Sequence, residues 1–237
     1  MKITSTSNQL IKDLVQLKKS SVRKKQRMFL AEGEDFIIEA ISSKLGERVF
    51  STEEKDYGLP LTLVSDNVLK KLSVYENSSA PIVLCRYKDE VVDFGDKLIY
   101  LDGVQDPGNV GTILRTALAF SYDGVIFSST SASIYSQKVI SASKGSIFHI
   151  PYSESITLEE LKNKGYEIIV TSLQDAISYQ DYKPNGKFVL VLGNEGQGVS
   201  SDILDRCDKN LYINMNSMVE SLNVGIACSI LFILSPP

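Results

Sequence analysis

Hydrophobic residues in the first part of this chain recur in short segments with different periods. Leu10, Leu14 and Leu17 recur at helical spacing and predict an amphipathic helix over about residues 7–20. Further apolar segments predict, in order, a strand and turn at 29–33, a helix around 36–41, a strand at 62–64, a short helix at 68–72 and a buried strand at 81–85. Together these elements predict a small α/β unit.

A polar stretch at 88–97 is the best candidate for a linker and predicts two domains, residues 1–95 and 96–237. Beyond it, uniformly apolar runs alternate with helical patterns. The runs predict strands at 98–101, 125–127, 168–170, 188–192 and 211–213. Because such runs suit strands covered on both faces, we expect an α/β domain with a mostly parallel sheet. Ligands usually bind beyond the carboxyl ends of such strands.

Composition narrows the class of protein. The chain has 237 residues, 43% of them hydrophobic, and no apolar run reaches the roughly 18 residues of a membrane span. The first residues lack a signal-type apolar stretch, so we expect a cytoplasmic protein without a membrane anchor. Cys85, Cys207 and Cys228 lack metal-site spacing, and the single histidine, His149, lies among apolar neighbours and is expected to pack there. We therefore expect no metal.

The net charge of −4 hides a basic segment near the N-terminus. The segment contains a run of basic residues, namely Lys12, Lys18, Lys19, Arg23, Lys24, Lys25 and Arg27. Asp13 is the only acidic residue near this run. A local patch of this kind can attract phosphate even on an acidic protein. The charge run alone favours the alternative of a solvated helix face.

The first of three unusual loops follows the strand at 98–101. Pro107 and Gly108 form a turn, and Asn109 is a candidate N-cap for the next helix. Arg115 flanks the apolar stripe of that helix, near its start. A strand-loop-helix junction could hold a phosphate or hydroxyl group at Asn109 and Arg115. The alternative is a capped helix with one surface arginine.

The second and third loops follow the strands at 188–192 and 211–213. Glycines at the first, fourth and sixth positions of residues 193–198 allow close backbone approach but fit neither a dinucleotide fingerprint nor a P-loop. Glu195 in its centre is either a surface acid or a positioned polar group. Ser221 in the third loop can cap the helix over 224–233, which is apolar nearly all round and should be covered.

Together the three loops resemble the motifs of the SpoU/TrmH branch of the SPOUT methyltransferases. The matching segments are residues 109–115, residues 192–196 with Gly198, and residues 220–224. The resemblance extends through residues 136–139 and 142–146. Residues 27–33 are similar to the substrate-binding extension of the family.

This resemblance implies an α/β fold with a deep trefoil knot in the C-terminal domain. It also implies a homodimer with active sites at the subunit interface, and S-adenosylmethionine as the methyl donor. The N-terminal domain would resemble ribosomal protein L30e and bind RNA. The expected reaction is methylation of a ribose 2′-hydroxyl, with ribosomal RNA favoured over transfer RNA by analogy.

The resemblance also assigns roles to residues of this chain. The cofactor pocket would use Leu192, Gly193, Ile213, Met215, Ser221 and Leu222. The catalytic or substrate-orienting set would be Asn109, Arg115, Glu195, Ser221 and Asn223. The RNA-binding set would be Lys18, Lys19, Arg23, Lys24, Lys25 and Arg27.

Two positions depart from the family pattern. Asn214 stands where proline is frequent, and Ser141 stands where arginine is common before the Ala-Ser segment. The first change would loosen the cofactor loop, and the second would remove an RNA contact.

The role of Arg115 stays open at this point. The resemblance implies that this arginine is the proton acceptor. However, a guanidinium is almost always protonated. The alternative is that Arg115 holds the phosphate beside the target ribose and stabilises the developing alkoxide. A non-catalytic RNA-binding protein of the same fold is a second hypothesis, which the intact Arg115, Glu195 and Asn223 argue against. A dinucleotide-dependent enzyme is disfavoured by the glycine spacing.

Overall fold

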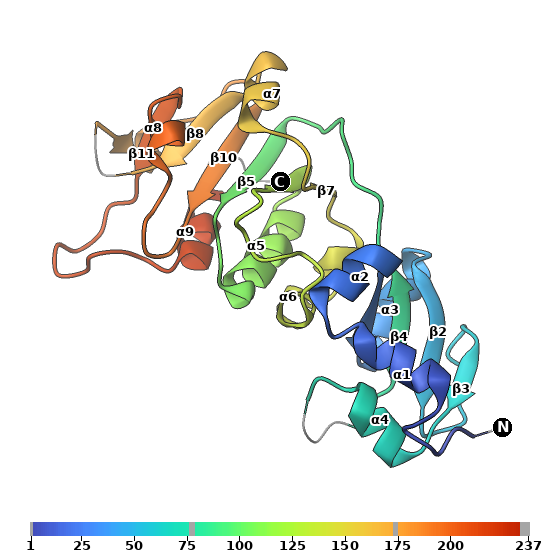
Figure 1. Ribbon diagram of the computed structural model, residues 1–237. Coiled ribbons are helices and arrows are strands. Elements are labelled where there is room, and N and C mark those ends of the chain that lie inside the picture. Colours follow the sequence, from blue (N-terminus) through green and yellow to red (C-terminus); the bar gives the residue numbers. More distant parts are fainter. Residues whose placement is uncertain (1, 76–78, 173–174, 233–237) are drawn as a thin grey trace. The chain divides into compact units, whose positions relative to one another are not determined.

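The computed structural model describes residues 2–75, 79–172 and 175–232 (Figure 1). Ile233, the last residue of the helix predicted at 224–233, lies outside these residues. Among the residues described, every helix is too short or too polar to cross a lipid bilayer.

Two compact units make up the chain. The first consists of Met1–Asp89 with Tyr135–Phe148, and the second of Glu90–Ile134 with His149–Pro237. These units do not coincide with the sequence ranges 1–95 and 96–237. Residues 90–95 belong to the second unit, and residues 135–148 belong to the first.

The first unit is built on a four-stranded mixed sheet in the order β1-β4-β2-β3. Its strands are β1 (Met28–Glu32), β2 (Gly46–Ser51), β3 (Leu61–Leu63) and β4 (Ile82–Arg86). Its helices are α1 (Gln9–Gln16), α2 (Ser20–Gln26), α3 (Glu34–Ser42), α4 (Asp66–Leu72), α6 (Gln137–Ser143) and the 3-10 helix η1 (Ser146–Phe148). The small α/β unit expected from the sequence is thus present.

One predicted helix of this unit is two helices in the structure. The predicted helix over residues 7–20 is α1 followed by a turn, and α2 then begins at Ser20. Arg23 of α2 is 4% exposed, and its Nη1 donates to the carbonyl oxygens of Leu17 (2.8 Å) and Lys18 (2.7 Å). These bonds satisfy carbonyls that the end of α1 leaves without helical partners. The break therefore depends on a buried arginine, which the apolar period does not reveal.

Residues 135–148 complete an aromatic cluster in the first unit. Phe29 lies 5.1 Å from the ring centre of Tyr135 and 5.8 Å from that of Phe148, and Tyr87 stacks on Tyr135 at 3.6 Å. His149, the next residue, is exposed, so the expectation that it packs in the core is wrong. Only its apolar neighbours are buried.

The second unit holds a seven-stranded sheet in the order β7-β6-β5-β10-β8-β11-β9, with every pair parallel. Its strands are β5 (Lys97–Asp102), β6 (Gly124–Phe127), β7 (Tyr152–Ser153), β8 (Glu167–Thr171), β9 (Ile177–Ser178), β10 (Phe188–Gly193) and β11 (Lys209–Tyr212). Its helices are α5 (Pro107–Ala119), α7 (Leu158–Asn163), α8 (Ser201–Leu204), α9 (Val224–Leu231) and the 3-10 helix η2 (Tyr179–Asp181). The predicted parallel α/β sheet is confirmed.

Helices cover both faces of this sheet, as the apolar runs predicted. Every residue of β10 is buried. Val189 and Val191 pack with Leu161 of α7 and Ile203 of α8 on one face. The alternate residues of β10 point to the other face, where α9 contacts both β10 and α5. Figure 1 shows α5 in green and α9 in red side by side.

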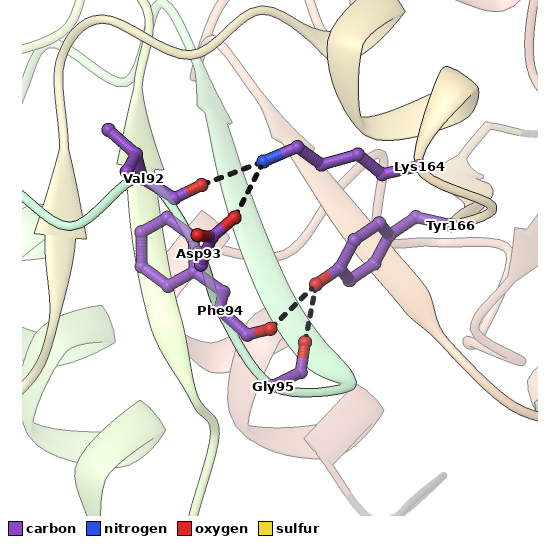
Figure 2. Close-up of polar contacts among 6 residues, drawn as sticks. All are labelled: Val92, Asp93, Phe94, Gly95, Lys164 and Tyr166. Carbon is purple, nitrogen blue, oxygen red and sulfur yellow. Dashed lines mark hydrogen bonds and ion pairs between the residues drawn. The ribbon is translucent and has the colours of Figure 1, made fainter.

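The predicted linker is hydrogen-bonded to the second unit. Figure 2 shows that Lys164 donates to the carbonyl oxygen of Val92 (2.8 Å) and to Oδ1 of Asp93 (3.1 Å). The hydroxyl of Tyr166 lies 3.1 Å from the carbonyl oxygen of Phe94 and 2.5 Å from that of Gly95. These bonds explain why the second unit begins at Glu90 and not after residue 95.

Candidate active site

The three loops flagged by the sequence follow strands whose carboxyl ends lie at one edge of the parallel sheet. β5 and β10 are neighbours, and Asp102 at the end of β5 pairs with Gly193 at the end of β10. On the side of β10 away from β5, the next strand is β8, and β11 pairs with β8. This edge is the usual ligand-binding position in a parallel α/β sheet.

A chain of side-chain hydrogen bonds joins one residue from each loop. Nδ2 of Asn109 donates to Oε1 of Glu195 (3.0 Å), and Nδ2 of Asn223 donates to Oδ1 of Asn109 (2.8 Å). Oδ1 of Asn223 accepts from the backbone N–H of Gly225 (2.9 Å). Because each amide both donates and accepts, the orientation of both asparagine side chains is determined. We call these residues the Glu195–Asn109–Asn223 chain.

Glu195 also accepts two backbone hydrogen bonds from the first loop. The N–H of Asp106 donates to Oε1 (3.0 Å), and the N–H of Gln105 donates to Oε2 (3.2 Å). Partial burial raises the pKa of Glu195, but these bonds and the bond from Asn109 outweigh it, so the net pKa is lowered. Glu195 is therefore an ionised hydrogen-bond acceptor at neutral pH.

The helix caps differ from those predicted. Asp106, not Asn109, is the N-cap of α5 and accepts from the N–H of Asn109 (2.9 Å). Asn223, not Ser221, is the N-cap of α9. Since Asp106 takes the capping position, the amide of Asn109 is available to connect Glu195 with Asn223. Ser221 is exposed in the loop before α9.

Arg115 stands apart from the Glu195–Asn109–Asn223 chain. It is exposed in the second half of α5, and not near the helix start as predicted. It lies six positions after Asn109, which corresponds to about 9 Å along a helix axis. Within the described part of the chain it makes no hydrogen bond or ion pair.

The predicted cofactor residues lie at the end of β10 and in the segment that follows β11. Leu192 and Gly193 are buried, while Ile213, Met215 and Leu222 are half-buried. A Cβ atom on Gly193 would lie 2.2 Å from the carbonyl carbon of Gly198, so only glycine fits. Apolar side chains beside closely packed backbone suit the adenine ring of S-adenosylmethionine, whose edge backbone groups can recognise.

Sequence reasoning missed two residues that shape this loop. Nδ2 of Asn194 donates to the carbonyl oxygen of Gly103 (2.8 Å), and its Oδ1 accepts from the N–H of Gly196 (2.9 Å). Oδ2 of Asp102 accepts from the N–H of Ser200 (2.7 Å). The sequence places Asp102 at the end of a predicted strand and Asn194 just after another, and this position could have identified both residues. Loops at the carboxyl ends of parallel strands are where ligands usually bind.

The basic residues of the first unit are not equivalent. Arg23 is used within the unit, as described above. Nζ of Lys18 donates to the carbonyl oxygens of Ser73 (2.6 Å) and Lys71 (3.0 Å), and its pKa is lowered by burial and by the charge of Lys71. The remaining predicted RNA-binding residues are exposed, namely Lys19, Lys24, Lys25 and Arg27, and Arg27 forms an ion pair with Asp89 (2.9 Å).

Two family models match this chain. The model of the SpoU rRNA Methylase family matches residues 96–233, and that of the MRM3-like substrate binding domain matches residues 8–82. A curated relative is the 23S rRNA (guanosine(2553)-2′-O)-methyltransferase RlmP of Bacillus subtilis (strain 168). It is 33% identical over 239 residues, which cover 97% of this chain and 96% of the relative.

Solved structures of RNA methyltransferases share the fold. An RNA 2′-O ribose methyltransferase aligns with a TM-score of 0.82 and 29% identity, covering 99% of this chain and 98% of that one. The S-adenosylmethionine-bound rRNA methyltransferase from Sinorhizobium meliloti aligns with a TM-score of 0.89 over 99% of this chain and 97% of that one. At 23% identity, the second similarity shows the fold alone.

The parallel α/β fold, the three loops at one edge of its sheet and the matches to known proteins identify the class of this protein. It is an S-adenosylmethionine-dependent RNA 2′-O-ribose methyltransferase. The matches span nearly the whole chain, and the protein belongs to the SpoU rRNA methylase family. The resemblance noted in the sequence, the enzyme class and the methyl donor are thereby confirmed.

The packing of Gly193 gives the first testable prediction. Replacing Gly193 with alanine should displace residues 194–198, because the new methyl group would meet backbone that cannot rotate away. We expect S-adenosylmethionine affinity to fall about 10-fold or more, as measured by calorimetry without added metal. Gly196→Ala is the matched control, since its Cβ would make only an ordinary contact at 3.6 Å. Equal affinities for the two variants would contradict the predicted pocket.

Proposed function

We propose that the RNA methylated by this protein is ribosomal RNA and that the reacting ribose binds at the Glu195–Asn109–Asn223 chain. This chain is the observation that carries the proposal, because it connects the polar side chains of three loops at one edge of the sheet. The 23S rRNA substrate in the name of the Bacillus subtilis relative supports ribosomal RNA. Bacterial ribosomal RNA implies the cytoplasm as the place of action.

S-adenosylmethionine supplies an electrophilic methyl group, and the protein must hold this group in line with the attacking oxygen. Leu192, Gly193, Ile213, Met215, Ser221 and Leu222 would hold the cofactor. Fixing two reactants in attack geometry contributes about 7–11 kcal/mol to lowering a barrier. The amides of Asn109 and Asn223, whose orientation is determined by Glu195 and by the start of α9, would position the ribose.

Arg115 would act from α5 as the holder of a phosphate next to the reacting ribose. Its side chain is exposed and makes no ion pair in the described part of the chain, so its fork of donors can face an RNA phosphate. A guanidinium so placed also stabilises negative charge that develops on the attacking oxygen. We prefer this role to proton acceptance because the guanidinium is already protonated.

We further propose a homodimer in which α5 and α9 form the interface. Leu118 of α5 is 37% exposed and Ile226 of α9 is 52% exposed, and the two helices are in contact. A second subunit covering these side chains would also explain why parts of the site are exposed in one chain. The deep trefoil knot and the L30e-like fold of the first unit belong to the same proposal, supported by family membership.

The surface for RNA in the first unit would consist of Lys19, Lys24, Lys25 and Arg27. Arg23 is left out because its guanidinium is buried and bound to carbonyl oxygens. Lys18 contributes less than the sequence suggested, because its ammonium group is already bound to two carbonyls.

The function is tested by label transfer from S-adenosylmethionine to purified bacterial ribosomal RNA, with transfer RNA in parallel. We expect labelled 2′-O-methylribose in ribosomal RNA. Label in transfer RNA alone would contradict the proposed substrate, and label in neither would contradict methyl transfer to these RNAs.

Glu195→Gln tests the chain that carries this proposal. The amide cannot accept all three hydrogen bonds made by Glu195, so Asn109 should lose its position and turnover should fall by about 10²-fold. Cofactor affinity should change little.

The matched control is Asp208→Asn. Asp208 lies in the same unit, also has a lowered pKa and accepts from the N–H of Ile168 (2.9 Å), but it lies outside the loops of the site. The Asp208→Asn variant should keep parental turnover.

The pH dependence gives a second check on Glu195. Because the pKa of Glu195 is lowered, its hydrogen bonds persist above its ordinary pKa and are lost only as pH falls through the lowered value. Glu195→Gln should therefore leave the shape of the rate profile between about pH 6 and 9 unchanged.

Arg115→Ala separates chemistry from RNA binding. Arg115 is exposed, so the variant should fold, dimerise and bind cofactor like the parent. At saturating RNA, the single-turnover rate should fall by about 10²–10⁴-fold if Arg115 acts on the reacting ribose. Arg115→Lys keeps the charge but not the planar fork, and it should fail to restore the rate if the contact is bidentate. Parental turnover by Arg115→Ala would remove Arg115 from the site.

Ile226→Lys tests the dimer. A charge at an apolar interface should dissociate the subunits, and light scattering should then change from twice the chain mass to 26.2 kDa. Ile38→Lys, on the exposed side of α3 in the first unit, is the control and should leave the mass unchanged. A parent protein that is already monomeric at micromolar concentration would refute the proposed interface.

A further inference from the structure

Tyr75 is the only aromatic residue that is exposed among those the structure describes. Its side chain is 47% exposed, although aromatic rings are normally buried because each contributes a large apolar area. It follows α4 in the first unit, where neither the Glu195–Asn109–Asn223 chain nor the predicted basic set accounts for it.

Hydrogen bonds hold the backbone of this residue in place. The N–H of Tyr75 donates to Oγ of Ser73 (2.9 Å), and Oγ of Ser73 lies 2.8 Å from both carboxylate oxygens of Glu32 at the end of β1. Nζ of Lys18 donates to the carbonyl oxygen of Ser73 (2.6 Å). The segment before Tyr75 is therefore tied to β1 and to the turn between α1 and α2, although the ring of Tyr75 is half exposed.

The phenol is fixed as well. The hydroxyl of Tyr75 donates to Oγ of Ser141 on α6, so the ring is held at both ends. The aromatic ring of tyrosine presents a flat face on which an unstacked base can stack.

Lysines lie on both helices next to the ring, and the one carboxylate bound nearby, that of Glu32, accepts from Ser73 and from the N–H of Val74. Lys138 is exposed and lies three residues before Ser141 on α6, a spacing that puts both on one side of the helix. Lys70 and Lys71 lie in the last turn of α4, and Lys71 is near enough to Lys18 to lower its pKa. A stacking surface flanked by lysines is the usual arrangement for single-stranded nucleic acid.

We propose that Tyr75 is a stacking surface for an unpaired base of the RNA substrate, with Lys138 and Lys71 facing the adjoining phosphates. We call Tyr75, Lys138 and Lys71 the Tyr75 platform. It restricts the substrate class to RNA with an unpaired nucleotide in a loop, bulge or end. Because hydrogen bonds already fix the ring, little side-chain freedom is lost when a base stacks on it. This inference rests on RNA being the substrate of the protein.

The probe is a short oligouridylate that carries one 2-aminopurine, whose fluorescence falls when it stacks on an aromatic ring. The full-length parent should quench it, whereas a blunt RNA duplex should compete weakly. Tyr75→Leu keeps an apolar side chain without a flat ring, and it should bind about 5- to 150-fold more weakly and lose the quenching. Tyr75→Phe should keep most of both signals. Ile38→Ala, an exposed apolar change on α3, is the control and should match the parent.

Two results, besides parental binding by Tyr75→Leu, would overturn the proposal. One is that parental protein binds the probe without quenching, which needs no variant to fold. The other is that Tyr75→Phe and Ser141→Ala lose as much affinity as Tyr75→Leu, because the hydroxyl bond would then matter and the ring would not. Methyl transfer by the parent separates these outcomes from failure of the proposed function. If label still reaches RNA while Tyr75→Leu binds like the parent, the Tyr75 platform is wrong and the methyltransferase function stands.

Discussion

The pairing of β10 with β5 is the constraint on which the site depends. These strands are far apart in sequence, yet they run parallel in register from Phe188 opposite Lys97 to Gly193 opposite Asp102. Parallel pairing brings both carboxyl ends to one edge, so the loop with Glu195 lies beside the loop with Asn109. A register shift of one residue would turn the side chains of β10 to the opposite faces and separate these loops.

Hydrogen-bond chemistry then determines which polar residue caps α5 and which one connects Glu195 with Asn223. Asp106 and Asn109 both lie where they could cap α5, and Asp106 does so. A carboxylate at the start of a helix is favoured by the helix dipole. The amide is more useful at Asn109, because it can donate to Glu195 and accept from Asn223 together. A carboxylate at position 109 would face Glu195 with like charge, which explains why this division between the two residues is stable.

Sequence periodicity predicted the second unit better than the first for a physical reason. Strands such as β10 are buried on both faces and therefore read as continuous apolar runs. In contrast, α2 has no apolar period of its own, because the residue it buries most deeply is Arg23. The burial of this charged residue depends on two carbonyl oxygens at the end of α1, a tertiary arrangement that no local pattern encodes.

The same limit applies to the site. The motifs identified Asn109, Glu195 and Asn223, and the structure connects them. They did not show that Asn109 leaves the cap to Asp106, nor that Asn194 joins the first two loops through the carbonyl of Gly103. Arg115 was found by its place in a motif, yet among the described residues it makes no hydrogen bond or ion pair to any of these side chains. Its geometry in one chain therefore does not define a partner for its guanidinium group.

The first unit illustrates why residue order is a poor guide to where a protein can be divided. Residues 135–148 follow β6 of the second unit in sequence, yet Tyr135 and Phe148 pack against Phe29 of β1. A cut at Asp89 would uncover that aromatic cluster and would also remove Ser141, which holds the hydroxyl of Tyr75. The orientation of a surface ring in the first unit is thus determined by a helix that the sequence places inside the methyltransferase domain. A change in the segment around α6 would therefore alter the first unit as well as the continuity of the second.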